Sequence, residues 1–120
     1  MANILTADDT ATMRQMISFT LSSAGHQVMQ ASDGTEALAL ARTRKFDLVI
    51  ADINMPNMDG ISLVKSLREL PDYKFTPILM LTTESQAEKR QEGRSAGATG
   101  WIVKPFNPEQ LLTVVKKVLG

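Results

Sequence analysis

The sequence predicts an α/β fold in which a parallel β-sheet is covered by helices on both faces. Short runs of Val, Ile and Leu alternate along the chain with segments of helical periodicity. Several of these runs lack polar alternation, which is typical of strands buried on both faces. At 120 residues the chain is expected to form one domain over residues 1–120. The repeated strand–helix alternation within this length predicts a doubly wound, five-stranded parallel sheet.

The first half of the chain contains three predicted strands, with a helix after each of the first two. The strands are the short apolar runs at 4–7, 27–31 and 48–52. Apolar residues recur at helical spacing between positions 13 and 24, and Gly25 behind them is typical of a helix end. The second helix is entered through Ser32-Asp33-Gly34 and carries its apolar residues at positions 37 to 41.

The second half continues the alternation, with strands predicted at 78–82 and 101–103. The third helix follows Asp59-Gly60, because apolar residues recur from position 61 onward. The fifth helix is the most clearly marked. Asn107 is a typical N-cap residue, and Pro108 fits the first helical position.

The fourth helix, predicted from roughly 86 to 96, is more polar than the others. Two capping boxes compete for its beginning, one formed by Ser85 with Glu88 and the other by Thr83 with Gln86. The sequence alone leaves both registers open.

Composition excludes several classes of function. Thirteen basic residues balance 13 acidic ones, and this neutrality argues against a dedicated nucleic-acid binder. There is no cysteine, which excludes disulfides and thiolate chemistry and fits a reducing compartment. No apolar run approaches the ~18 residues needed to cross a bilayer, and the N-terminus has no export signal. We therefore expect a cytoplasmic protein with no membrane partner.

Polar residues collect at the predicted carboxyl ends of the strands. In open parallel sheets, ligands bind outside these ends, near the point where the strand order reverses. The opposite strand ends offer no comparable cluster. If the carboxyl ends share one edge, three carboxylates, a hydroxyl and an ammonium converge there, from Asp8, Asp9, Asp52, Thr82 and Lys104.

Each of these residues has an ordinary structural explanation when it is taken alone. Acids at a helix start favour the helix dipole, and an aspartate that ends a strand can form a turn. Thr82 is a common type of strand residue, and Lys104 would ordinarily be solvated. The combination is less ordinary, because three clustered carboxylates repel one another and raise each other's pKa. Mg²⁺, a hard cation with oxygen ligands, removes this cost.

Charge counting favours phosphoryl chemistry at this cluster. Three carboxylates and one lysine carry a charge of −2, which one Mg²⁺ neutralises. An arriving phosphoryl group could be shared between the metal and Lys104, with a hydrogen bond from Thr82. Asp52 is the natural nucleophile because its strand is central, and its attack would give an aspartyl-phosphate. Asp8 and Asp9 are better placed to hold the metal.

At these positions the sequence resembles the receiver domain of two-component response regulators, specifically the single-domain chemotaxis type. The resemblance runs from residue 4 to 119. It rests on four segments at the family's spacing: Ala7-Asp8-Asp9, Asp52-Ile53-Asn54-Met55-Pro56-Asn57-Met58-Asp59-Gly60, Leu81-Thr82 and Gly100-Trp101-Ile102-Val103-Lys104-Pro105-Phe106. The resemblance implies a flavodoxin-like fold with five helices and strand order 2-1-3-4-5. It also implies a single receiver domain without an output domain.

The resemblance implies a role for each matching site residue. Asp52 would be the phosphoacceptor, receiving its phosphoryl group from a phosphohistidine on a sensor histidine kinase. Asp9, Asp52 and the backbone carbonyl of Asn54 would coordinate Mg²⁺, and Asp8 would act largely through water. Lys104 would pair with the phosphoryl oxygens.

The resemblance also implies a conformational switch. Thr82 would move toward the phosphoryl group, which would let Trp101 swing inward and remodel the face formed by the fourth helix, fifth strand and fifth helix. Trp101 stands where Tyr or Phe is more usual in the family. The peptide bond between Lys104 and Pro105 is expected to be cis.

The expected function is a signalling switch that catalyses only its own phosphorylation and dephosphorylation. Asn54 and Glu84 match the pair found in chemotaxis-type members that lose phosphate quickly, which predicts a short-lived aspartyl-phosphate. The expected partners are a sensor histidine kinase, a downstream target such as the flagellar motor switch, and a phosphatase. A stand-alone phosphorelay intermediate or another single-domain regulator would look much the same. We expect a monomer.

Two other classes of function fit less well. A Mg²⁺-dependent phosphohydrolase with an aspartyl nucleophile usually carries that residue after its first strand and needs a cap or substrate loops, for which this chain has no room. A flavodoxin-like carrier needs a phosphate cradle. The loop at 8–12 has no glycine, and its acids would repel a bare phosphate.

Overall fold

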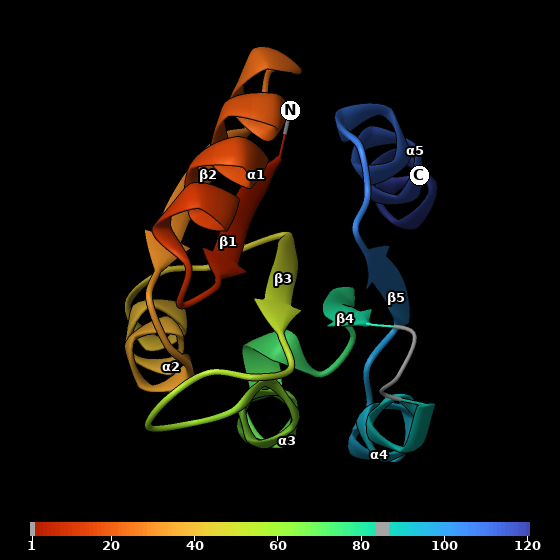
Figure 1. The fold of residues 1–120 in the computed structure, drawn as a ribbon. Helices are drawn as coiled ribbons and strands as arrows, with labels where there is room; N and C mark the ends of the chain where they lie inside the picture. The colour runs from red at the N-terminus through yellow and green to blue at the C-terminus, as the bar shows by residue number, and fades with distance from the viewer. Residues whose placement is uncertain (1, 84–86) are drawn as a thin grey trace.

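A five-stranded parallel sheet forms the centre of the computed structural model, which describes residues 2–83 and 87–120 (Figure 1). The strand order is β2-β1-β3-β4-β5, so the predicted fold class and order are confirmed. The strands are β1 (Asn3–Ala7), β2 (Gln27–Ala31), β3 (Leu48–Asp52), β4 (Ile78–Thr83) and β5 (Gly100–Lys104). Each agrees with its predicted run to within one residue at either end.

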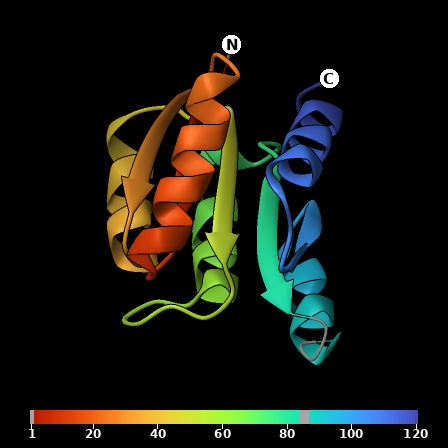
Figure 2. The ribbon, with the colours of Figure 1, turned by 45° about the horizontal axis from the view of Figure 1, so that its top comes forward.

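Five helices cover the two faces of the sheet (Figure 2). They are α1 (Ala11–Ser23), α2 (Gly34–Thr43), α3 (Gly60–Arg68), α4 (Ala87–Ala96) and α5 (Pro108–Leu119), with a short 3-10 turn, η1 (Pro71–Tyr73), before β4. Buried side chains of α1 and α5 pack on one face, and those of α2 and α3 pack on the other.

The central strand β3 explains why the apolar runs lack polar alternation. All five of its residues are buried. Val49 and Ala51 belong to the core under α2 and α3, while Leu48 and Ile50 belong to the core under α1 and α5. Because β3 is covered on both faces, neither face meets solvent. Asp52, the residue that ends this strand, is therefore held at a fixed position.

The helix beginnings and ends follow the predicted signals. Asp33 and Asp59 accept hydrogen bonds from the backbone N–H groups of residues 36 and 62, at 2.8 and 2.7 Å. Asn107 and Gln110 form a reciprocal capping box at the start of α5. Gly25, at φ +94°, follows α1 in the left-handed region that favours glycine.

Helix α4 is the least buried of the five. Gly93 is its only buried residue among those described, because the segment is almost entirely polar. The helix begins at Ala87, whereas both competing caps involve Ser85 or Gln86, which lie outside the described residues. Within residues 2–83 and 87–120, no helix has the length and apolar character required to cross a membrane.

Candidate functional site

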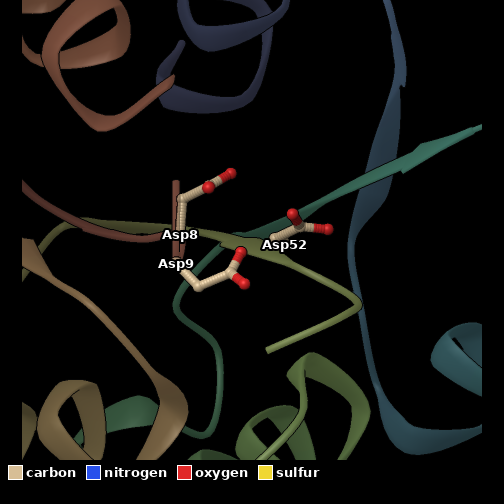
Figure 3. A group of neighbouring side chains, drawn as sticks. All are labelled: Asp8, Asp9 and Asp52. Atoms are coloured by element: carbon tan, nitrogen blue, oxygen red, sulfur yellow. The ribbon is translucent and has the colours of Figure 1, made fainter. Parts of the chain in front are cut away.

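The three predicted carboxylates meet at the carboxyl edge of the sheet. Asp8 and Asp9 follow β1, and Asp52 ends the neighbouring strand β3. One oxygen from each carboxylate lies within 4.8 Å of the others, and Figure 3 shows the three side chains side by side. The parallel pairing of β1 with β3 produces this cluster, because it aligns Ala7 with Ala51 and so brings the following residues together.

Asp8 is the most deeply buried of the three acids. Its side chain is 1% exposed, and its Oδ1 accepts a hydrogen bond from the Thr10 backbone N–H at 2.8 Å. Its Oδ2 is buried and has no hydrogen-bond partner among the described residues. Burial raises the pKa of Asp8, and the charges of Asp52 and Asp9 raise it further, while the Thr10 N–H and Lys104 act in the opposite direction.

Lys104 contributes the cation of the cluster from the end of β5. Its Nζ lies 2.6 Å from Oδ2 of Asp52 and 3.7 Å from Oδ2 of Asp8. The other oxygen of Asp52 accepts a hydrogen bond from the Asn54 backbone N–H at 3.2 Å. The peptide bond between Lys104 and Pro105 is cis, as expected.

The donor set fits a divalent hard cation. Three carboxylates and one ammonium leave an excess of two negative charges, and Asp8 presents a buried oxygen that no described hydrogen-bond donor satisfies. Asp9 is exposed, so one side of the cluster is open to solvent and to ligands. Mg²⁺ binds carboxylate oxygens and keeps several waters, which suits an open cluster of this charge.

Thr82 lies on β4, the strand next to β3, one residue beyond the position that pairs with Asp52. It is fully buried, and its hydroxyl donates a hydrogen bond to the Thr83 carbonyl at 3.1 Å. On the outer strand, β5, Val103 pairs with Thr82 and Trp101 pairs with Met80. The predicted site and switch residues therefore lie on successive strands.

The side chain of Trp101 contacts α4. The guanidinium of Arg94 lies 5.1 Å from the centroid of the indole ring, a distance at which cation–π attraction operates. The indole nitrogen Nε1 is buried, close to Gly93, and has no hydrogen-bond partner among the described residues. The side chain as a whole is half-buried.

Of the proposed dephosphorylation pair, Asn54 is exposed beside the cluster. Glu84 lies outside the described residues.

Sequence reasoning missed two groups of contacts around the cluster. Arg14, on α1, donates a hydrogen bond from its guanidinium to the Asp8 carbonyl at 2.6 Å. The loop after Asp52 is fastened to the start of α2 by Asn57 and Asp33. Both contacts join segments that are close only in the folded chain, so the sequence does not predict them. The one weak indication was Asn57 itself, because Asn tolerates the left-handed backbone conformation found in turns.

A cavity of about 800 Å³ opens at the opposite edge of the sheet, and its lining includes His26, Asp47 and Lys116. None of the acid cluster lines it. His26 Nδ1 accepts a hydrogen bond from the Ala2 backbone N–H at 3.1 Å, so this half-buried side chain has a structural role there.

Comparison with known proteins gives a consistent result. Residues 4–116 match the family model of the response regulator receiver domain. Chemotaxis protein CheY-3 of Vibrio cholerae is 39% identical over 116 residues, an alignment that covers 96% of this chain and 89% of the relative. The structure of chemotaxis response regulator CheY4 of Vibrio cholerae superposes with a TM-score of 0.94, at 56% identity over 98% of each chain.

A more distant solved structure shares the fold and is described with a bound metal. The receiver domain of sensor histidine kinase PA1611 from Pseudomonas aeruginosa PAO1 has a TM-score of 0.92 and 26% identity, covering 99% of this chain and 98% of its own. That structure is described with a magnesium ion coordinated in its active-site cleft.

Proposed function

Because this chain belongs to the response regulator receiver domain family, we propose that Asp52 accepts a phosphoryl group in a Mg²⁺-dependent reaction and thereby switches partner binding. Receiver domains act as signalling switches in two-component systems, and they generally bind Mg²⁺ at an aspartate cluster. The observation that carries the proposal is the cluster of Asp8, Asp9 and Asp52, with Lys104 in direct contact with Asp52.

The residues that would hold the metal are Asp9, Asp52 and the backbone carbonyl of Asn54, with Asp8 acting through water. The buried Oδ2 of Asp8 supports this assignment: it has no hydrogen-bond donor among residues 2–83 and 87–120, and a metal-bound water would supply one. When bound there, Mg²⁺ would supply positive charge that stabilises the phosphoryl oxygens.

Phosphoryl transfer would begin with attack by an Asp52 carboxylate oxygen on the phosphorus of a phosphohistidine. The new O–P bond forms as the N–P bond breaks, and the imidazole nitrogen of the kinase keeps the electron pair. Lys104 is already placed to leave Oδ2 of Asp52 and pair with a phosphoryl oxygen, since the two atoms lie 2.6 Å apart. Attack by water would later release inorganic phosphate and regenerate Asp52, at a rate tuned by Asn54 and Glu84.

The change would be communicated across two strands. Thr82 would turn its hydroxyl from the Thr83 carbonyl to a phosphoryl oxygen, and Trp101 would respond on the outer strand. The surface that this changes is formed by α4, β5 and α5. A groove beside Trp101, lined by residues that include Phe106 and Val114, lies on this surface and provides apolar contact area for a partner.

Chemotaxis is the setting we propose for this switch, because CheY-3 and CheY4 are chemotaxis proteins and are similar over nearly the whole chain. The proposed partners are a sensor histidine kinase, a downstream target such as the flagellar motor switch, and a phosphatase. A monomeric, cytoplasmic protein that acts through its own surface is consistent with this role. A stand-alone phosphorelay intermediate is the alternative within the same chemistry.

Phosphorylation by a small donor tests the proposal directly. The protein is incubated with acetyl phosphate and Mg²⁺, and a phosphoryl adduct is sought on Asp52 by mass spectrometry while Trp101 fluorescence is followed. We expect an adduct and a fluorescence change in the wild type and neither in Asp52→Asn. Asp72→Asn, at an exposed acid on η1, serves as the matched control and should behave as the wild type. Absence of an adduct on Asp52 in the wild type would refute the proposal.

A further inference from the structure

The loop between β3 and α3 is fastened to the beginning of α2. It extends from Asp52 toward α2 before it returns to α3 (Figure 1). Within this loop, Nδ2 of Asn57 donates a hydrogen bond to Oδ2 of Asp33 at 2.7 Å. Beside it, the Gly34 backbone N–H donates to the Met58 carbonyl at 3.2 Å. The two contacts join loops that follow β2 and β3, the strands on either side of β1.

Asp33 is held rigidly enough to serve as an anchor. Its Oδ1 accepts the Glu36 backbone N–H at 2.8 Å, which caps α2, while its Oδ2 faces Asn57. The two hydrogen bonds lower the pKa of Asp33, the helix N–H being the larger cause. The side chain is therefore a carboxylate at neutral pH, and a hydrogen bond to a charged acceptor is stronger than one to a neutral acceptor.

Asn57 has a left-handed backbone conformation, which the contacts around it stabilise. Its φ is +67°, in the left-handed region, which Asn adopts at lower cost than most residues. The Met58 N–H donates to the Pro56 carbonyl at 2.7 Å, so the chain turns tightly at this point. Position 34 leaves no room for a side chain, because a Cβ there would collide with the Met58 carbonyl.

The fastened loop carries Asn54, whose backbone carbonyl belongs to the proposed metal site. Asn54 is exposed, and its own N–H bonds to Oδ1 of Asp52. The loop is held on both sides of Asn54: the Ile53 carbonyl accepts a hydrogen bond at 2.9 Å from the N–H of Gly60, the first residue of α3, and Asn57 donates its hydrogen bond to Asp33. Fixing both sides limits the orientations of the carbonyl between them, which lowers the entropy lost when the carbonyl binds a cation.

We propose that Asp33 and Asn57 are positioning residues for Mg²⁺: their hydrogen bond presets the Asn54 carbonyl and so strengthens metal binding at the Asp8, Asp9 and Asp52 cluster. The inference rests on the proposed function. Neither residue would be a metal ligand. Asp33 is outside the group of carboxylates whose oxygens lie together, and it acts only through the loop.

The test is Mg²⁺ titration by calorimetry with a charge-matched swap. Asn57→Asp places two carboxylates against each other and breaks the hydrogen bond, although the added negative charge alone would favour a cation. Asp33→Asn combined with Asn57→Asp restores the bond with its direction reversed. In this swap Asn still caps α2, and the total charge equals that of the wild type. Asp33→Asn alone, which keeps the cap and can bond as an amide pair, is the control.

We expect Mg²⁺ binding to weaken about tenfold in Asn57→Asp, in line with the effect of residues that orient metal ligands. The swap and the control should return to within about twofold of the wild type. A second measurement, amide hydrogen exchange of residues 54–58 in EDTA, should show faster exchange in Asn57→Asp and recovery in the swap. This readout separates loop order from any change in overall stability.

The outcomes distinguish the two proposals. If wild type binds Mg²⁺ and Asn57→Asp binds it equally well, or the swap fails to recover, the positioning role is wrong while the metal site stands. If the wild type binds no Mg²⁺, both the metal site and the positioning role fall.

Discussion

The ammonium of Lys104 lies 2.6 Å from Oδ2 of Asp52, and this contact joins the outermost strand of the sheet to its central one. Within residues 2–83 and 87–120, Lys104 is the only cation that forms an ion pair with the acid cluster. Its loss would leave the buried carboxyl groups of Asp52 and Asp8 without this cation. The contact therefore stabilises the metal-free state, and under the proposed function it would hold the lysine close to an arriving phosphoryl oxygen.

Replacing Lys104 with Gln should destabilise the metal-free protein. We expect a loss of about 1–3 kcal/mol in the free energy of unfolding, between the values typical of exposed and buried ion pairs, since the lysine side chain is 22% exposed. Urea denaturation in EDTA measures it. Lys116→Gln, at an exposed position on α5, should change stability by less than about 0.5 kcal/mol. Equal effects of the two substitutions would contradict the assigned role.

Asp8→Asn should stabilise the metal-free protein near neutral pH. Because the folded-state pKa of Asp8 is raised, the folded protein holds this proton more tightly than the unfolded chain. The free energy of unfolding therefore falls as pH rises through that pKa. The Asn variant has no such proton to lose, so its advantage in the free energy of unfolding should grow toward pH 7 and vanish below the usual pKa of 3.8.

Thermal melts of both proteins in EDTA between pH 3.5 and 7.5 would measure the difference. Asp72→Asn should follow the wild type throughout. A wild-type advantage that grows toward neutral pH would show that Asp8 is stabilised as a carboxylate, against the expectation.

Added Mg²⁺ should reverse the cost of the clustered acids. A ligand that binds only the folded state raises the free energy of unfolding by about 2.7 kcal/mol when its concentration is 100 times its dissociation constant. We expect the melting temperature of the wild type to rise with Mg²⁺, and that of Asp9→Asn to rise much less. Asp9 is exposed, so its replacement leaves the packing intact. A matched increase in ionic strength from KCl is the control, and an equal rise with KCl would point to simple screening.

Arg94→Gln should loosen the packing of Trp101. The guanidinium covers the indole ring at 5.1 Å, and a neutral amide would lose the cation–π attraction, about 0.5–1 kcal/mol at an exposed site. Because the chain has one tryptophan, acrylamide quenching of its fluorescence reports on this side chain alone. We expect more efficient quenching in Arg94→Gln. Lys89→Gln, on the same helix and paired with Glu92, should leave quenching unchanged.

Gly60→Ala should be far more damaging than Gly100→Ala. A Cβ at position 60 would collide with the backbone carbonyl of Asp52, whereas one at position 100 would only touch a Leu79 methyl group at an ordinary 3.5 Å. We expect a loss of more than about 2 kcal/mol for the first substitution and less than about 1 kcal/mol for the second. Chemical denaturation measures both. Similar values would mean that the loop after Asp52 can shift freely.

Much of the fold was predictable because the signals are local. The apolar runs gave the strands, and Asp33, Asp59 and Asn107 marked three helix beginnings that the structure confirms. The meeting of Asp8, Asp9 and Asp52 was predictable too, since parallel strands place their carboxyl ends at one edge. The strand order came from the family resemblance, because no local pattern specifies which strands are neighbours.

The contacts that the sequence could not predict depend on side-chain geometry between distant segments. Arg14 reaching the Asp8 carbonyl, Asn57 reaching Asp33 and Arg94 covering Trp101 each require the folded positions of two elements. A polar surface residue has the same appearance in a sequence whether it is solvated or bonded. Nor does the sequence reveal that Oδ2 of Asp8 is buried without a hydrogen-bond donor from the described part of the chain, because that depends on the folded positions of all its neighbours.

The sheet order has an evolutionary consequence. The acid cluster belongs to β1 and β3, well inside the sheet, while Trp101 belongs to β5 at its border and contacts the sparsely buried helix α4. Few packing constraints bind α4, so its surface residues can diverge without disturbing the carboxylates. Among paralogues within one genome, sequence variation should therefore concentrate on α4 and β5. Each paralogue could then bind its own partner protein, while β1 and β3 keep the same carboxylates.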